Sequence, residues 1–267
     1  MNCAIHPICR LSDTQRGQDD LSPLVTSPRA KYYLKKHAFI RRVRRHWIIL
    51  DVHNDEYYCI PAALFSSIAP LIHGSDRECH SDTSDSACRR DGVAEIETEL
   101  VSRGVLGLFE ERPENPSESD LITPTSVLRI NSGRIRAANR IAMLPTFLLA
   151  CTIADRRLRN HTFESTVQAA RARRTRNARD AIPFDITCAQ WLVSVFESLR
   201  LWYPRAYLCM FDSLALLEFM ALHKLYPLWT FGVSSDPFQA HCWIQAGNIA
   251  INDSLSRISY YTPIMSV

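Results

Sequence analysis

The feature that most constrains this chain lies near its C-terminal end, where a cysteine stands between a proline and a long apolar run. Pro204 ends any helix that precedes it, because proline lacks a backbone N–H and its ring disfavours helical geometry. Apolar residues then recur at helical spacing over residues 213–225, which predicts a buried helix. Cys209 therefore lies at or just before the first turn of that helix. Unpaired backbone N–H groups and the positive end of the helix dipole favour a thiolate there.

A histidine and a carboxylate follow downstream on a predicted hairpin. Two runs of strand-forming residues flank a turn at Gly247 and Asn248. His241 lies on the first strand, and Asp253 ends the second. A nucleophile, a base and a carboxylate that orients the base are the parts of a catalytic triad. An isolated cysteine is most often a small buried core residue, but this downstream pair favours a reactive role for Cys209.

The register of the hairpin stays open in the sequence. A two-residue turn places Cys242 opposite Asp253, whereas a three-residue loop that begins at Ala246, or a bulge, places His241 there. Asn252 is therefore an alternative residue for orienting the base. Cys242 is a rival nucleophile because it is next to His241. Adjacent strand residues point to opposite faces, however, so we expect Cys242 to face away from the imidazole and to pack.

These residues resemble a known family. Cys-x-x-x-Ser-Leu-Ala opens the predicted helix, Ala-His-x-Trp-Ile follows on the hairpin, and Ile-Asn-Asp ends it. This pattern resembles the leader peptidases of lasso-peptide biosynthesis, often called B proteins, in the transglutaminase-like branch of papain-type cysteine proteases. The resemblance implies that Cys209 is the nucleophile, His241 the base and Asp253 the orienting carboxylate.

The match is close over residues 203–253 and looser elsewhere in the catalytic domain. Residues 210–212 read Met-Phe-Asp, where a leucine and a basic residue are frequent in the family. Cys242 stands where a small residue is usual. Neither departure changes a residue of the triad.

The resemblance also implies a reaction and its partners. Such an enzyme is a cysteine endopeptidase that removes the leader peptide from a lasso-peptide precursor. It acts with an asparagine-synthetase-like cyclase that uses ATP to close the ring. This chain has no G-x-x-x-x-G-K-[ST] phosphate-binding loop, so we assign ATP to the maturation system and expect no cofactor bound here. Nine cysteines without a C-x-x-C pair argue against a zinc ribbon, and we expect no metal.

The N-terminal half predicts a small sheet followed by helices. Strands are expected over residues 32–43, 47–52 and 57–60, and helices over 62–72, which Pro61 opens, and 93–106. This order resembles the winged-helix precursor-recognition domain of many ribosomal-peptide maturation enzymes. In that family the leader peptide adds as an extra strand, which is β-augmentation. The expected peptide-binding residues are Tyr57, Tyr58, Cys59 and Ile60. A small wing without any ligand is the alternative.

These features predict an α+β chain with four parts. Residues 1–30 lack periodicity and are expected to form a disordered tail. Residues 31–107 are the expected recognition domain, and residues 108–125, which are rich in Glu, Pro and Ser, are the expected linker. Residues 126–267 are the expected transglutaminase-like catalytic domain. Within it, residues 126–158 look helical, with a core stripe at Ile141, Leu144, Leu148 and Leu149 and a kink or break at Pro145.

Charge and composition narrow the remaining possibilities. A formal net charge of +3 is too small to argue for nucleic acid as a partner. No apolar run reaches the roughly 18 residues of a membrane span, and no secretory signal is evident. An odd cysteine count without a signal predicts free thiols in a cytoplasmic protein. Arginines gather over residues 156–179, which is either a solvated basic face or a docking surface for an acidic partner or a nucleotide phosphate.

Two other functions fit the same residues. The first is a transglutaminase-type acyltransferase, which uses the same triad but passes the acyl group to an amine. The second is a binding protein that delivers the leader and carries an inactive triad.

Overall fold

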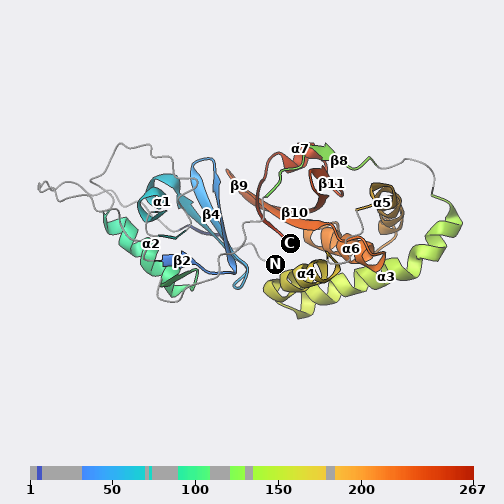
Figure 1. Cartoon of the computed structure of the whole chain (residues 1–267), viewed down its shortest axis with the longest axis horizontal. Helices are drawn as coiled ribbons and strands as arrows, with labels where there is room; N and C mark the ends of the chain where they lie inside the picture. The colour runs from blue at the N-terminus through green and yellow to red at the C-terminus, as the bar shows by residue number, and fades with distance from the viewer. Residues whose placement is uncertain are drawn as a thin grey trace, which may run out of the picture. The chain divides into compact units, whose positions relative to one another are not determined.

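The computed structural model describes residues 5–7, 32–69, 72–73, 90–108, 121–129, 135–178 and 184–267. The chain mixes helices with three sheets (Figure 1). It divides into two compact units, Met1–Ser117 and Glu118–Val267. The division falls within residues 108–125, where the linker was expected. The first unit contains two of the sheets, and the second contains the third.

The first unit is built around an antiparallel meander. Its described elements are β1 (Ile5–Pro7), β2 (Tyr32–Leu34), β3 (Ala38–Val43), β4 (His46–Asp51), β5 (Glu56–Pro61), α1 (Ala62–Ile68), β6 (Ile72–His73), α2 (Arg90–Ser102) and β7 (Leu106–Leu108). Strands β3, β4 and β5 pair antiparallel as expected, but β1 adds a fourth strand, so the sheet has the order β1-β5-β4-β3. The expected first strand is divided, because residues 32–34 belong to a second sheet of order β6-β2-β7.

Every second side chain of β4 and of β5 points into the core of this unit. Trp47 and Ile49 of β4 share one buried cluster with Tyr58 and Ile60 of β5, as expected when every second residue faces one side of a sheet. The same cluster includes residues of both α1 and α2. The rings of Trp47 and Phe65 of α1 stack with centroids 4.5 Å apart. Helix α1 begins directly after Pro61, as the sequence predicted.

Strand β1 changes the edge of this sheet. Residues 1–30 were expected to form a disordered tail, yet residues 5–7 pair in parallel with β5. For these three residues the expectation of disorder is wrong, and the rest of that tail lies outside the described residues. The free edge expected at β5 therefore has a neighbour within the same chain. The physical reason is that an edge strand offers unpaired N–H and C=O groups to any extended segment, which three residues can use without a detectable sequence period.

The second unit places helices beside a five-stranded sheet. Its elements are β8 (Ser126–Val127), α3 (Ala137–Asn160), α4 (Phe163–Ala178), α5 (Ile186–Arg200), α6 (Cys209–Leu222), β9 (Leu228–Ser235), β10 (Phe238–Ala246), β11 (Ile249–Ala250), α7 (Leu255–Ile258) and β12 (Thr262–Ser266). The strand order is β12-β9-β10-β11-β8. Helix α6 packs against β10, α3 and α5 (Figure 1). Residues 213–220 of α6 are all buried, because a helix that is apolar on every side belongs in a core.

The segment before α6 corrects two expectations. Residues 126–127 form β8 rather than helix, and α3 begins only at Ala137 and continues through Pro145. The apolar stripe expected in the core is exposed or half-exposed, with Ile141 at 71% exposure. The buried face of α3 instead carries Phe147, Ala150, Cys151 and Ala154. Small residues let α6 and α5 approach closely, and this close approach outweighs the larger apolar area of the leucines.

Helix α3 also bears on the membrane question. Among the described residues it is the one helix long and apolar enough to cross a membrane, judged by length and composition. One such helix is weak evidence for a span, since helices of water-soluble proteins pass the same test.

Close packing at Gly232 supports the sheet beside α6. Gly232 of β9 pairs with His241 of β10 in the antiparallel ladder. A Cβ atom at Gly232 would lie 2.8 Å from the ring of Trp243 and 3.0 Å from Cβ of Tyr261. Both aromatic side chains flank His241, with ring centroids 6.1 Å and 5.1 Å from the imidazole.

We therefore expect Gly232→Ala to lower the free energy of unfolding by about 1–3 kcal/mol, because the added methyl group overpacks a filled site. Denaturant unfolding followed by tryptophan fluorescence measures this change. Ser234→Ala on the same strand is the matched control and should stay within about 0.5 kcal/mol of the unaltered chain. Equal stability of the two variants would contradict the packing argument.

Candidate active site

The candidate nucleophile opens a buried helix. Cys209 is the first residue of α6, and Leu208 at the N-cap has an extended backbone with φ −134° and ψ 128°. The N–H groups of a first helical turn have no partner inside the helix, so they face outward beside the thiol. No side chain caps this helix at Leu208. Instead, Asp212 reaches back and accepts the backbone N–H of Leu208 at 2.8 Å.

A buried arginine that no sequence motif indicated fixes the loop that leads into Cys209. Arg200, at the end of α5, is 3% exposed and donates from Nε to Asp212 Oδ1 at 2.5 Å. Its other nitrogens donate to backbone carbonyls of Tyr203, Arg205 and Ala206 at 3.0–3.2 Å. Two sequence features could have indicated this contact. Asp212 lies in the first turn of one expected helix, and Arg200 lies at the end of the helix before it. Their pairing depends on how the two helices pack.

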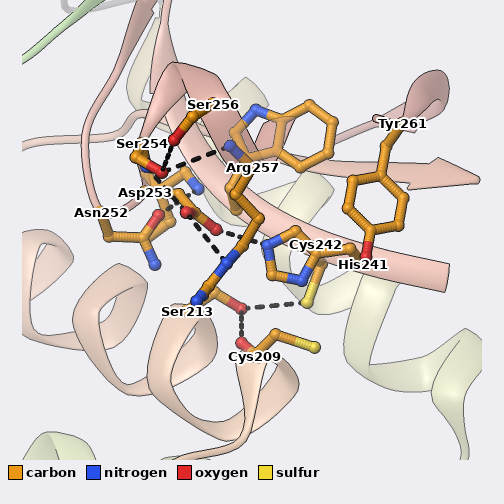
Figure 2. A network of polar contacts seen from close by, with 12 residues as sticks. Cys209, Ser213, His241, Cys242, Asn252, Asp253, Ser254, Ser256, Arg257 and Tyr261 are labelled. Carbon is orange, nitrogen blue, oxygen red and sulfur yellow. Dashed lines mark hydrogen bonds and ion pairs between the residues drawn. The ribbon is translucent and has the colours of Figure 1, made fainter. Parts of the chain in front are cut away.

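The base and its carboxylate meet across the hairpin. His241 Nε2 contacts Asp253 Oδ2, and both side chains are almost wholly buried. Asp253 Oδ1 accepts the backbone N–H of Ser254 at 2.7 Å, and Arg257 Nε lies 3.8 Å from it. Because Nε2 faces the carboxylate, Nδ1 is the ring nitrogen left for the thiol. Figure 2 shows the imidazole with Asp253 near one nitrogen and the Cys209 side chain on the side of the other.

The hairpin brings His241 and Asp253 together with a geometry that differs from both registers expected from the sequence. Gln245 pairs with Ala250, so the turn has two residues, and Gly247 takes the positive φ of 55° that such turns need. That register alone would place Cys242 opposite Asp253. The ladder ends early, however, because the Asn252 side chain accepts the N–H of Ile244 at 2.7 Å. The chain then bends, and Asp253 turns toward His241. Asn252 thus shapes the bend and does not contact the imidazole.

The Cys242 side chain faces α6. It is 2% exposed, and its Sγ lies 3.3 Å from Ser213 Oγ. The Ser213 hydroxyl donates to the Cys209 carbonyl at 2.6 Å and accepts from Trp229 Nε1 at 2.9 Å. Ser213 therefore links the start of α6 to strands β9 and β10 (Figure 2). Cys242 is packed as expected, but it also lowers the pKa of Cys209, although adjacent strand residues were expected to point to opposite faces.

These neighbours change the ionisation of the site. The pKa of the Cys209 thiol falls from its ordinary value of 9.0 to about 4, because the Cys242 thiol donates to it and His241 adds a hydrogen bond and a positive charge. Burial lowers the pKa of His241, but hydrogen bonds and negative charge from Asp253 and Cys209 outweigh it and raise that pKa to about 9. Burial raises the pKa of Cys242 well above 9.0, so that thiol keeps its proton. Between about pH 4 and pH 9 the pair is a thiolate and an imidazolium.

The expected peptide-binding residues lie in the other unit. Tyr57, Tyr58, Cys59 and Ile60 are consecutive residues of β5, and three of their side chains are buried, with Cys59 half-buried. A peptide can therefore use their backbone groups more readily than their side chains. Among the described residues no group of three or more His, Cys, Asp or Glu side chains could hold a metal ion.

A family comparison agrees with the catalytic geometry. Residues 146–266 match the model of the transglutaminase-like superfamily. This span runs from within α3 to β12 and contains Cys209, His241 and Asp253. Members of the superfamily are usually cysteine-dependent enzymes. No curated protein and no solved structure matches the chain.

We expect Cys242→Ala to raise the pKa of Cys209 toward its ordinary value, because the largest stabilising hydrogen bond to the thiolate is lost. The midpoint of Cys209 alkylation by iodoacetamide should then move to higher pH by at least about one unit. Mass spectrometry of the labelled peptide measures alkylation at this cysteine alone. Cys188→Ala on α5 is the control and should leave the midpoint unchanged. An identical midpoint in Cys242→Ala would show that the neighbouring thiol does not stabilise the thiolate.

Proposed function

We propose that this chain is a cysteine endopeptidase that removes the leader peptide from a lasso-peptide precursor before a partner cyclase closes the ring. The observation that carries the proposal is the contact of His241 with Asp253 beside a cysteine of low pKa at the start of a buried helix. The transglutaminase-like match supports a protease or acyltransferase type of catalytic domain. The sequence resemblance around these three residues supports the narrower reaction.

In the proposed mechanism the Cys209 thiolate attacks the carbonyl carbon at the leader–core junction. The carbonyl oxygen becomes an oxyanion, which accepts the backbone N–H of Cys209 at the helix terminus. The His241 imidazolium donates its proton to the leaving amine of the core peptide, so the C–N bond breaks and a thioester to the leader remains. Neutral His241 then takes a proton from water, the hydroxide attacks the thioester, and the leader leaves as a carboxylate. Asp253 holds the imidazole orientation throughout.

For the first unit we propose leader recognition by a winged-helix-like domain. The leader strand would pair with the backbone of β5 at Tyr57, Tyr58, Cys59 and Ile60, which is β-augmentation. Support comes from the antiparallel strands β3, β4 and β5 and from β1, which pairs with β5 along the side opposite β4. Backbone pairing suits this site because most of these side chains are already buried.

For the second unit we propose that exposed arginines dock the cyclase, which supplies the ATP-dependent step. Arg156 on α3 and Arg171, Arg174 and Arg176 on α4 are exposed. Two other arginines of the expected basic set, Arg157 and Arg173, are instead held by Glu218. The docking surface is thus narrower than the sequence suggested, and Arg179 lies outside the described residues. We propose the cytoplasm as the place of action, because the site depends on reduced thiols.

The decisive test first searches the genes neighbouring that of this chain for a small precursor peptide, and then identifies by mass the products that the chain makes from it. Cys209→Ala and His241→Ala should each abolish leader removal, while Cys242→Ala should retain most of it at pH 8–9, where even a normal thiol is partly ionised. Asp253→Asn should shift the alkaline limb of the pH profile to lower pH, because it removes the carboxylate that raises the pKa of His241. It should cost less activity than Cys209→Ala.

The products separate the alternatives. A leader joined to an added amine, in place of a free leader carboxylate, would favour the acyltransferase function. Leader removal that persists in Cys209→Ala would favour a delivery protein whose triad is inactive. Cys188→Ala, which changes a cysteine far from the triad in the sequence, is the control for nonspecific loss of thiols.

A further inference from the structure

The loop between α5 and α6, residues 201–208, presents apolar side chains beside Cys209. Tyr207 is 64% exposed and Leu208 is 54% exposed, although Leu208 directly precedes the nucleophile. Leu201 and Trp202 at the start of the loop are more exposed still. A group of large apolar side chains in water next to a reactive thiol is typical of a binding surface.

The same loop is firmly held, so its exposed side chains do not result from poor packing. Arg200 donates hydrogen bonds to three backbone carbonyls of the loop, those of Tyr203, Arg205 and Ala206. It also donates to Asp212 in the first turn of α6. Its guanidinium lies 4.2 Å from the centroid of the Tyr207 ring, which orients that ring by a cation–π contact. A side chain that is already oriented loses little conformational entropy when a ligand binds.

The low charge of the loop favours an apolar ligand. Arg205 is the one charged residue in 201–208, and it pairs with Asp155 of α3. The surface around Tyr207 and Leu208 therefore offers apolar area and little charge. The loop also runs directly into Cys209, so a peptide carbonyl at the thiolate would bring its neighbouring residues near this surface, since an extended chain advances about 3.3 Å per residue.

We propose that Tyr207 and Leu208 form an apolar subsite that receives a large apolar side chain of the substrate peptide, within about two residues of the bond that Cys209 attacks. The proposal rests on the peptidase function proposed above and names the side-chain class that the site selects. An apolar side chain entering this subsite removes its own surface and that of the loop from water, whereas glycine or aspartate gains no such burial.

The test uses the full chain and peptides that span the leader–core junction. Each residue within two positions of the cleaved bond is changed in turn to leucine, glycine or aspartate. At one position the unaltered chain should prefer leucine to glycine in kcat/KM by about tenfold or more. Tyr207→Ala and Leu208→Ala should reduce that preference by about fivefold or more, whereas Tyr207→Phe should keep it. Ile141→Ala, an exposed apolar residue on α3, is the control.

Two outcomes separate this inference from the function on which it rests. An unchanged leucine-to-glycine ratio in Tyr207→Ala, with Cys209-dependent cleavage intact, overturns the subsite alone. Absence of Cys209-dependent cleavage for every peptide overturns the proposed function. Cys209 alkylation at the same rate in Tyr207→Ala and in the unaltered chain shows that the nucleophile stays in place.

A different observation concerns the edge of β5. This strand pairs with β4 on one side and with β1 on the other. The parallel register with β1 places residues 5, 6 and 7 opposite residues 57, 58 and 59. Three of the four residues proposed to receive the leader are thus already paired. One side of a strand has a single row of N–H and C=O groups, so it pairs with one strand at a time.

The strand that holds this edge is short. β1 has three residues, and Pro7 has no backbone N–H, which limits the hydrogen bonds that it can form. A longer peptide strand could make more hydrogen bonds along the same row. We propose that β1 is an internal competitor, which covers the edge in the absence of leader and is displaced when the leader binds. This second proposal rests on leader recognition at β5. The apparent Kd of the leader is raised by the factor 1 + K, where K is the ratio of covered to open edge.

The test uses a glycine variant, in which Ile5 and His6 are replaced with glycine and Pro7 is kept, in the full chain carrying Cys209→Ala, which prevents cleavage. Binding of a fluorescent leader peptide, taken from the precursor that supports the cleavage test above, is titrated by anisotropy. We expect the glycine variant to bind the leader about 3- to 30-fold more tightly, because the competitor is removed. Replacement of Thr14 and Gln15 with glycine is the matched control and should leave the Kd unchanged.

A second probe does not depend on the leader. A synthetic peptide of residues 1–12, with both cysteines replaced by serine, should bind the glycine variant more tightly than the unaltered chain. The leader peptide should displace it. Equal leader affinity in the glycine variant and its control overturns the competitor. Lack of leader binding in both, with the 1–12 peptide still bound, overturns leader recognition instead.

Discussion

The packing of α6 against β10 is the interaction on which the rest of the candidate site depends. The helix carries Cys209 on its first turn, and the strand carries His241, so the contact between them is set by how these two elements pack. Ser213 holds that packing at its most sensitive point, because its hydroxyl bonds to the Cys209 carbonyl, to Trp229 and to Cys242. A displacement of about 1 Å between reacting groups greatly slows a reaction. The contact between α6 and β10 is therefore held both by apolar packing and by hydrogen bonds.

Burial raises the pKa of a cysteine, and the hydrogen-bond donors around each sulfur decide whether that rise persists. Cys151 on α3 lies among apolar residues, and burial raises its pKa to about 12. Cys209 lies exposed at the start of α6, and its pKa falls to about 4, because the Cys242 thiol and the His241 imidazolium donate to it. The difference does not come from the residue type or from depth alone. It comes from donors that the fold brings to one sulfur and not to the other.

The two units use backbone and side chains differently. In the first unit the functional candidate is a row of backbone groups along β5, and its aromatic side chains are used to build the core. In the second unit the candidates are side chains held at the end of a helix and along a hairpin. Arg200 acts on both the backbone and a side chain. Its buried guanidinium fixes backbone carbonyls of the loop before α6, and it also orients the exposed ring of Tyr207. Rigid support beneath exposed groups is what a binding surface requires.

The sequence by itself determined the local elements that carry chemistry. Pro204 and the apolar period after it located the start of α6, and the glycine turn with flanking β-formers located the hairpin, because turn chemistry and periodicity act over a few residues. Tertiary structure alone decided which residues of those elements meet. Asn252 ended the ladder and let Asp253 reach His241, the Cys242 thiol came to lower the pKa of Cys209, and the large aliphatic side chains of α3 came to lie on its exposed face. The pairing of residues 5–7 with β5 was equally beyond the sequence. Each of these outcomes depends on competition between distant segments for the same hydrogen bonds or the same buried area, and no local pattern records the result of that competition.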